Sequence, residues 1–292
     1  MVAGYVVMRV ALLAQWLRVA RSSPAHRTTA LTYVAFVAVA QVGWVLAAIA
    51  HLALGPMLLA AAVLYLVELG GPVVAELRGA GTPWHPHHIA ERYSLLTIIA
   101  LGEGVIGTVA AVEPIIGQQG WASDAIMVVA GGTVLTFGLW WVYFSVPFGE
   151  ILHAAGRSGW VSFVFGYGHI PLFAAIAAVG AGLHVAAYVV EGEAHVGFPV
   201  AVQAVAIPVG VFLVALFAIY ALLVRRVDAL HVALLAGVVA VLVLAVALSR
   251  GGLSFGASVA ILAVTPAVVV VGYEMAGHRH AAEHVASLRA RG

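Results

Sequence analysis

The chain has 292 residues, of which 64% are hydrophobic and only 9% are charged. A soluble domain does not need that much apolar surface, whereas a protein that crosses a membrane several times does. There is no cysteine, which excludes disulfides and thiolate metal sites, and the formal net charge is +1. Because no basic run suits nucleic acid, we also exclude a nucleic-acid partner.

Apolar windows along the chain predict nine membrane-spanning helices joined by short loops. They lie near 2–20, 29–51, 56–77, 93–113, 124–147, 160–188, 198–224, 229–249 and 252–273. An apolar run of about 20 residues spans a hydrocarbon core of about 30 Å, because each helical residue rises about 1.5 Å. No segment resembles a soluble domain or a flexible linker. We therefore expect a single all-α transmembrane domain over 1–292, a polytopic helix bundle.

The arginines predict how this bundle is oriented, because positive residues concentrate on the cytoplasmic side of membrane proteins. If residue 1 lies outside the cell, Arg250 is in an outer loop and Arg9 lies within a span. All the other basic residues then fall on the inner side: Arg18, Arg21, Arg27, Arg78, Arg92, Arg157, Arg225, Arg226, Arg279, Arg289 and Arg291. We therefore expect the C-terminus to be cytoplasmic.

The helix predicted near 93–113 carries a carboxylate, Glu103, in its middle. A charged side chain at the centre of a membrane is costly and rarely occurs without a partner or a function. Ala100, Gly104 and Thr108 lie around it at four-residue spacing, and small residues at that interval let another helix approach closely. We expect this helix to be buried in the bundle, with Glu103 facing protein or a water-filled cavity.

Two further ionisable side chains, His169 and Glu68, fall near the depth of Glu103 when residues are counted from the ends of the spans. Ionisable groups at one depth are typical of a transport or proton-relay site, and Tyr167 lies beside His169 in the sequence. Equal depth does not make them neighbours, so separate groups satisfied by nearby hydroxyls or carbonyls are the alternative. Pro171 frees a backbone carbonyl that suits a cation, although proline is also common in membrane helices without that role.

Arg9 is the other costly residue, and it shares a helical stripe with Tyr5 and Trp16. Two interpretations stand with equal weight. The guanidinium pairs with a carboxylate, for which Glu68 is the nearest candidate, or it extends to the outer headgroups.

Glu91 and Arg92 lie at the inner mouth of the helix that carries Glu103. One interpretation is a helix start that is capped by negative charge and anchored by positive charge. The other is an inner gate leading to Glu103, because Arg92 lies eleven residues before Glu103 and almost on the same helical face.

Histidine-rich segments at 84–88 and 278–284 resemble metal sites, since histidine is a common ligand. A proline-bearing loop and a tail can each be rich in histidine without binding anything, and we predict no metal site and no cofactor. No nucleophile elbow, phosphate-binding glycine loop, haem attachment site or zinc-protease motif is present. An enzyme is therefore not the leading hypothesis.

Two of these motifs together resemble the bacterial low-temperature-requirement protein A (LtrA) family. They are ERYSLLTIIALGE at 91–103 and GYGHIPL at 166–172, and the segments 5–9, 15–18 and 140–144 are similar as well. The match covers roughly residues 1–185, and the last three spans match only as generic membrane helices. The resemblance implies a multi-pass protein of the bacterial inner membrane, named for a growth phenotype, with no settled activity, and it supplies no catalytic residues to carry over. It also implies that further N-terminal helices of the family precede the point where this chain begins.

The function that fits best is a transporter or channel for a small solute or ion, proton-coupled through Glu103 and His169. The partners are then the lipid bilayer and an unidentified solute, and an oligomer is compatible with the sequence. The alternatives are a lipid-acting enzyme or accessory factor within the bilayer, and a non-catalytic sensor or structural membrane protein. A water-filled cavity at Glu103 would indicate transport, and a lateral groove with two acids would indicate an enzyme. A dry core in which every polar group is paired would indicate a sensor or structural protein.

Overall fold

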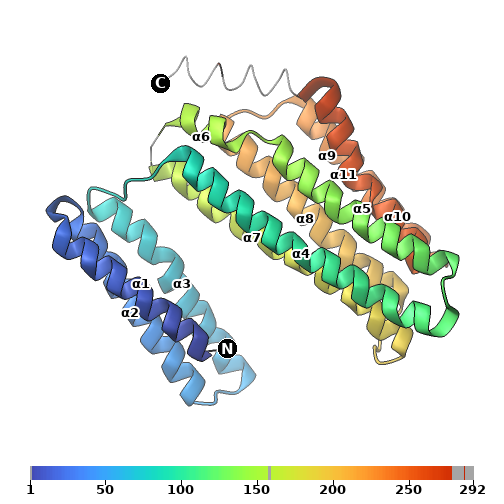
Figure 1. Ribbon diagram of the computed structural model, residues 1–292, viewed down its shortest axis with the longest axis horizontal. Helices are drawn as coiled ribbons and strands as arrows, with labels where there is room; N and C mark the ends of the chain where they lie inside the picture. The colour runs from blue at the N-terminus through green and yellow to red at the C-terminus, as the bar shows by residue number, and fades with distance from the viewer. Residues whose placement is uncertain (1, 157–158, 278–285, 287–292) are drawn as a thin grey trace. The chain divides into compact units, whose positions relative to one another are not determined.

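The computed structural model describes residues 2–156, 159–277 and 286 (Figure 1). The secondary-structure elements of these residues are all helices. Arg157, Arg279, Arg289 and Arg291, which contribute to the predicted orientation, lie outside the described residues, and so does the histidine-rich tail at 278–284. The chain divides into two compact units, Met1–Trp84 (unit 1) and His85–Gly292 (unit 2), and each is described by itself.

Unit 1 is built from three long helices joined by short connections. Its elements are α1 (Val2–Ser22), the short 3₁₀ turn η1 (Pro24–His26), α2 (Arg27–Ile49) and α3 (Leu54–Arg78). α2 packs against both α1 and α3. The contact with α3 is close because Gly71 has no side chain, and a methyl group there would lie 2.8 Å from Cβ of Phe36. α2 also contacts α1, where Tyr33 stacks on Trp16 with ring centroids 4.2 Å apart.

Unit 2 contains the remaining helices. They are α4 (Pro86–Gln119), α5 (Ser123–Ser145), α6 (Phe148–Ala155), α7 (Gly159–Glu191), α8 (Phe198–Val224), α9 (Ala229–Arg250), α10 (Phe255–Leu262), α11 (Val264–Gly272) and the π-helical turn η2 (Tyr273–Gly277). Local signals fix several helix starts. Proline at the first position suits the start of α4. Asp228 caps α9 by accepting a hydrogen bond from the backbone N–H of His231 at 2.8 Å.

α7 is the central helix of unit 2, and it packs along both α4 and α8. Glycines make these contacts close. A methyl group at Gly107 of α4 would lie 2.9 Å from Cα of Gly180 in α7, and one at Gly182 would lie 2.5 Å from the carbonyl carbon of Ala204 in α8. The helices therefore meet almost backbone to backbone, as small residues permit in membrane bundles.

The prediction of an all-α polytopic membrane bundle is confirmed. Eight segments of the described chain are long and apolar enough to cross a membrane: 24–49, 54–78, 86–119, 123–155, 159–191, 198–224, 229–250 and 255–275. The span predicted near 2–20 corresponds to α1, which is a helix but is not among the eight, and it carries Arg9, Arg18 and Arg21. That all these helices form a single transmembrane domain stays a prediction.

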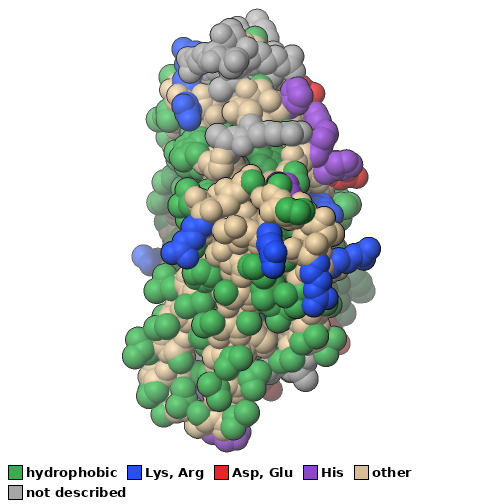
Figure 2. Space-filling view, turned by 90° about the vertical axis from the view of Figure 1, so that its left-hand side faces the viewer, with side chains coloured by type: hydrophobic (Ala, Val, Ile, Leu, Met, Phe, Trp, Pro, Cys, Tyr) green, Lys and Arg blue, Asp and Glu red, His purple; other side chains and the backbone are tan. Residues whose placement is uncertain are grey.

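The surface of the helices is also that of a membrane protein. Large apolar side chains such as Leu58 and Leu66 in unit 1 and Ile99 and Val243 in unit 2 are more than half exposed. Figure 2 shows one face of the molecule, on which hydrophobic side chains cover much of the surface and charged side chains are few. Such a surface suits lipid rather than water.

Candidate functional site

His169 occupies the middle of a polar contact between α5 and α7. Its side chain is fully buried, with 0% of its surface exposed. Nδ1 lies 2.6 Å from the backbone carbonyl oxygen of Phe165, one turn earlier in α7. Nε2 lies 3.0 Å from the hydroxyl of Tyr143 in α5. A carbonyl only accepts, so Nδ1–H donates to it, and in the neutral ring Nε2 then accepts the hydroxyl proton of Tyr143.

Aromatic rings from four helices enclose this histidine. The ring centroids that lie 4.4–5.8 Å from that of His169 belong to Tyr93 of α4, Tyr143 of α5, Phe148 of α6, and Phe165 and Phe173 of α7. We call this group the aromatic box. Inside this apolar enclosure the two hydrogen bonds satisfy both nitrogens of the imidazole. The ring contacts hold the four helices together at one level of unit 2.

Glu103 lies elsewhere on α4, and the equal depth predicted for Glu103 and His169 is wrong. Tyr93 is the α4 residue beside His169, whereas the backbone of Glu103 packs on Gly180, eleven residues beyond His169 in α7. The two levels are about 15 Å apart along the helices. The depth was misjudged because α4 begins at Pro86, seven residues before the apolar run predicted to start at 93.

The carboxylate of Glu103 is on the exposed face of α4 in unit 2, together with Arg92. Within the described residues it forms no hydrogen bond or ion pair. Other positions of α4 are buried, as predicted, at Gly104, Gly107 and Thr108, and Gly107, one turn after Glu103, meets the same Gly180 of α7. Unit 2 therefore holds the helix but does not enclose its acid.

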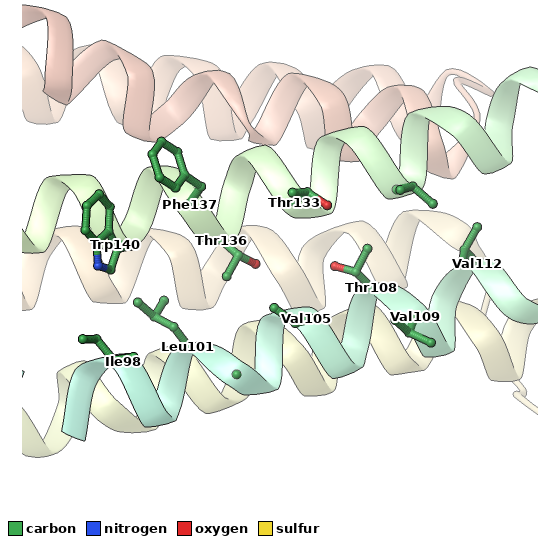
Figure 3. A pocket seen from close by; sticks show the side chains of 12 residues that line it. Ile98, Leu101, Val105, Thr108, Val109, Val112, Thr133, Thr136, Phe137 and Trp140 are labelled. Atoms are coloured by element: carbon green, nitrogen blue, oxygen red, sulfur yellow. The ribbon is translucent and has the colours of Figure 1, made fainter. Parts of the chain in front are cut away.

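A groove runs between α4 and α5 (Figure 3). Gly102, the residue before Glu103, is part of its lining, and the groove has a volume of about 510 Å³. Its lining combines apolar side chains of the two helices with the side chains of Thr108, Thr133 and Thr136. Thr108 donates its hydroxyl proton to the Gly104 carbonyl at 2.7 Å. The described lining residues carry no ionisable side chain, so the groove is apolar with a few hydroxyls.

Unit 1 brings together the two ionisable residues that the sequence paired. Nη2 of Arg9 lies 3.2 Å from Oε1 of Glu68, and the two side chains are 22% and 15% exposed. The Tyr5 hydroxyl donates to the same carboxylate oxygen, and the guanidinium lies over the Tyr5 ring at 4.8 Å. The pairing of Arg9 with Glu68 is confirmed. Extension of Arg9 to the headgroups is not what the structure shows.

The other candidates are less engaged. Glu91 lies 3.9 Å from Nδ1 of His88 at the exposed start of α4, which matches a helix start stabilised by charge. Tyr167 is half-buried and stacks on Phe163, one turn earlier in α7. Where α4 begins, the His85 and His88 ring centroids are 5.0 Å apart, but no group of three metal-ligand side chains occurs in the described part of the chain.

Sequence reasoning missed Tyr143 as a site residue, although it lies in the segment 140–144 that resembles the family. Trp140, Trp141 and Phe144 are between 37% and 42% exposed, but Tyr143 is 1% exposed and binds His169. The helical period carried the signal, since Leu139 and Tyr143 lie one turn apart on the buried face of α5. A second missed group is Glu76 in unit 1, which accepts hydrogen bonds from the Tyr33 hydroxyl at 2.9 Å and the Thr82 backbone N–H at 2.8 Å.

Helices of membrane-spanning length, with charged and polar side chains paired inside them, define a multi-pass integral membrane protein. The family model described as "Bacterial low temperature requirement A protein (LtrA)" matches residues 1–270, so the chain belongs to this family. The match extends through α8 and α9, where the sequence motifs showed only generic membrane helices. A search of curated proteins and a search of solved structures each found no match.

Proposed function

We propose that this protein moves a small solute or ion across the cell membrane and that Glu103 couples the movement to protons. One observation carries the proposal. The Glu103 carboxylate lies in the middle of a membrane-spanning helix, on an exposed face, with no protein hydrogen bond among the described residues. A charge at that depth costs about 2.5–3.5 kcal/mol on insertion scales, and such residues mark ion and proton pathways.

The chemistry of a lone carboxylate suits this role. A carboxyl group can carry a proton as the neutral acid and bind a cation as the carboxylate. In this proposal, a change in what faces α4 switches Glu103 between these two uses. Arg92 shares the exposed face of α4 and lies nearer the helix start. There its positive charge would attract an anion that enters or leaves.

His169 takes a different part in this proposal. Both of its ring nitrogens are engaged and the aromatic box encloses it, so it has no path of hydrogen bonds to Glu103 about 15 Å away along α4 within the described residues. We assign it the role of a fixed junction between α5 and α7.

The alternative function, a lipid-acting enzyme, would use the groove between α4 and α5. The apolar and threonine side chains that line this groove supply neither an acid nor a base.

The test is proton flux into vesicles that contain the purified protein and a trapped pH-sensitive dye. A pH gradient is imposed, and small inorganic ions and amino acids are added in turn as candidate solutes. Glu103→Gln keeps the shape and polarity of the side chain but removes its titration. We expect this variant to fold normally and to lose the solute-dependent proton flux.

Glu113→Gln is the matched control, because Glu113 is also exposed on α4 but lies ten residues further along the helix. It should keep the flux of the parent. Thermal unfolding of both variants separates lost transport from lost stability. If Glu103→Gln moves protons like the parent at every pH, the carboxylate is structural and the proposal fails.

A further inference from the structure

A second groove lies between α8 and α9, on a part of unit 2 that the proposed transport does not use. Its volume is about 410 Å³. Two of the side chains that line it are polar, Gln203 and Arg250, and the others are apolar, among them Ile207, Val243 and Ala247. At Gly210 the groove lacks a side chain, and a methyl group there would lie 3.1 Å from Cδ1 of Leu242, so the glycine keeps this part of the groove open.

The two polar residues sit at the same end of the groove. Arg250 is the last residue of α9, and Gln203 lies in the second turn of α8, which begins at Phe198. Arg250 is exposed, and within the described residues neither side chain has a hydrogen bond or ion pair with the protein. A guanidinium offers several donors in a planar fork that fits a phosphate, and an amide adds a further donor.

The dimensions of the groove indicate what fills it. From Val239 to Arg250 the lining extends over twelve residues of α9, and the eleven rises between them correspond to about 16 Å. That is about half of a hydrocarbon core of about 30 Å. A ligand with an anionic head at Arg250 and an apolar tail along the rest of the groove therefore occupies one leaflet.

We propose that the groove between α8 and α9 binds one anionic phospholipid. Its phosphate is held by Arg250 and Gln203, and one acyl chain lies against Ile207, Gly210 and Val243. The orientation predicted from the arginines places this lipid in the outer leaflet. Glu103 is not among the residues of this site, so the lipid proposal is tested independently of the proposed transport.

The test is native mass spectrometry of the full purified chain, stripped of lipid in detergent and then titrated with phosphatidylglycerol. The parent should retain one phosphatidylglycerol more tightly than phosphatidylethanolamine, which is zwitterionic, or a free fatty acid, which has no phosphate. Arg250→Gln should weaken retention about ten-fold, since charge-assisted hydrogen bonds are lost. Arg250→Lys should keep part of the affinity. Ala247→Phe should fill the groove and displace the lipid without touching the charge.

Matched controls separate a specific site from general adhesion. Arg226→Gln removes an exposed arginine just beyond the other end of α8, and Leu248→Phe enlarges an exposed side chain of α9 that does not line the groove. Both should retain the lipid like the parent. Equal retention by Arg250→Gln and the parent overturns the proposal. So does an equal loss in Arg226→Gln, or equal retention of the three lipids by the parent.

Discussion

Replacing Tyr143 by phenylalanine removes one oxygen atom from the most enclosed polar contact of unit 2. The hydroxyl lies 3.0 Å from Nε2 of His169, and the two side chains are 1% and 0% exposed. Without it, Nε2 loses its donor. Because aromatic rings surround the imidazole, water has little access to replace the lost hydrogen bond, and a buried acceptor left unpaired is destabilising.

The magnitude follows from the setting. Hydrogen bonds between membrane helices contribute about 0.6 kcal/mol on average and about 1.7 kcal/mol at most. The hydrogen bond between Tyr143 and His169 is enclosed, which places its contribution in the upper part of that range. We therefore expect the free energy of unfolding to fall by about 1–1.5 kcal/mol. For a chain of this size 1 kcal/mol corresponds to about 2–4 °C in Tm, so Tyr143→Phe should lower Tm by about 2–6 °C.

The assay is thermal unfolding in detergent of Tyr143→Phe, His169→Phe and the double variant. If the two side chains are bonded, the double variant loses less stability than the sum of the single losses. Tyr188→Phe removes a hydroxyl from an exposed tyrosine of the same helix as His169, and it should change stability by less than about 0.5 kcal/mol. Strictly additive losses would show that Tyr143 and His169 do not act as a pair.

Three other predictions follow from the packing and the charges. Gly107→Ala places a methyl group against the backbone of Gly180, which cannot move aside, so Tm should fall by an amount equivalent to about 1–3 kcal/mol. Arg9→Ala should destabilise the protein, and adding Glu68→Gln should cost less in that background than it does in the parent. The chain has no cysteine, so a single cysteine at Glu193 should react with an impermeant reagent added outside intact cells, as the predicted orientation requires.

Each of these three has its own control. A methyl group at Gly102 of α4 would meet no other atom within 4 Å, so Gly102→Ala should leave Tm unchanged or raise it slightly. If Gly102→Ala and Gly107→Ala behaved alike, close contact of α4 with α7 would be refuted. Additive losses at Arg9 and Glu68 would argue against their ion pair. A cysteine at Arg225 should stay unlabelled in intact cells, and its labelling would reverse the orientation.

The fold could be predicted from the sequence because the bilayer imposes a simple rule. Backbone groups in lipid must pair within a helix, so long apolar runs have one solution. The run that was hardest to classify is α1, where Arg9 interrupts the apolar pattern. Here the cost of an unpaired charge pointed to Glu68 as a partner, and the ion pair is present.

The candidate site was harder to predict, because hydropathy gives depth poorly and gives no contacts between helices. α4 starts with a polar turn at Pro86 that belongs to the helix but not to the apolar run, so the depth of Glu103 was misjudged relative to His169. The small residues around Glu103 correctly marked an interface. However, Gly104 faces the neighbouring helix while Glu103, one residue earlier, projects about 100° away from it.

The two kinds of contact along α4 differ in how they resist motion. At Tyr93 the helix contributes a ring to the aromatic box, and the interlocking rings oppose both sliding and rotation of the helix. At Gly107 it meets Gly180 through backbone surfaces that have no side chain to interlock. α4 is therefore held at both levels, by interlocking rings at Tyr93 and by close backbone packing at Gly107. Glu103 lies one turn before Gly107, about 15 Å from the aromatic box along the helix, so the backbone that carries it is fixed against α7 while its side chain stays exposed.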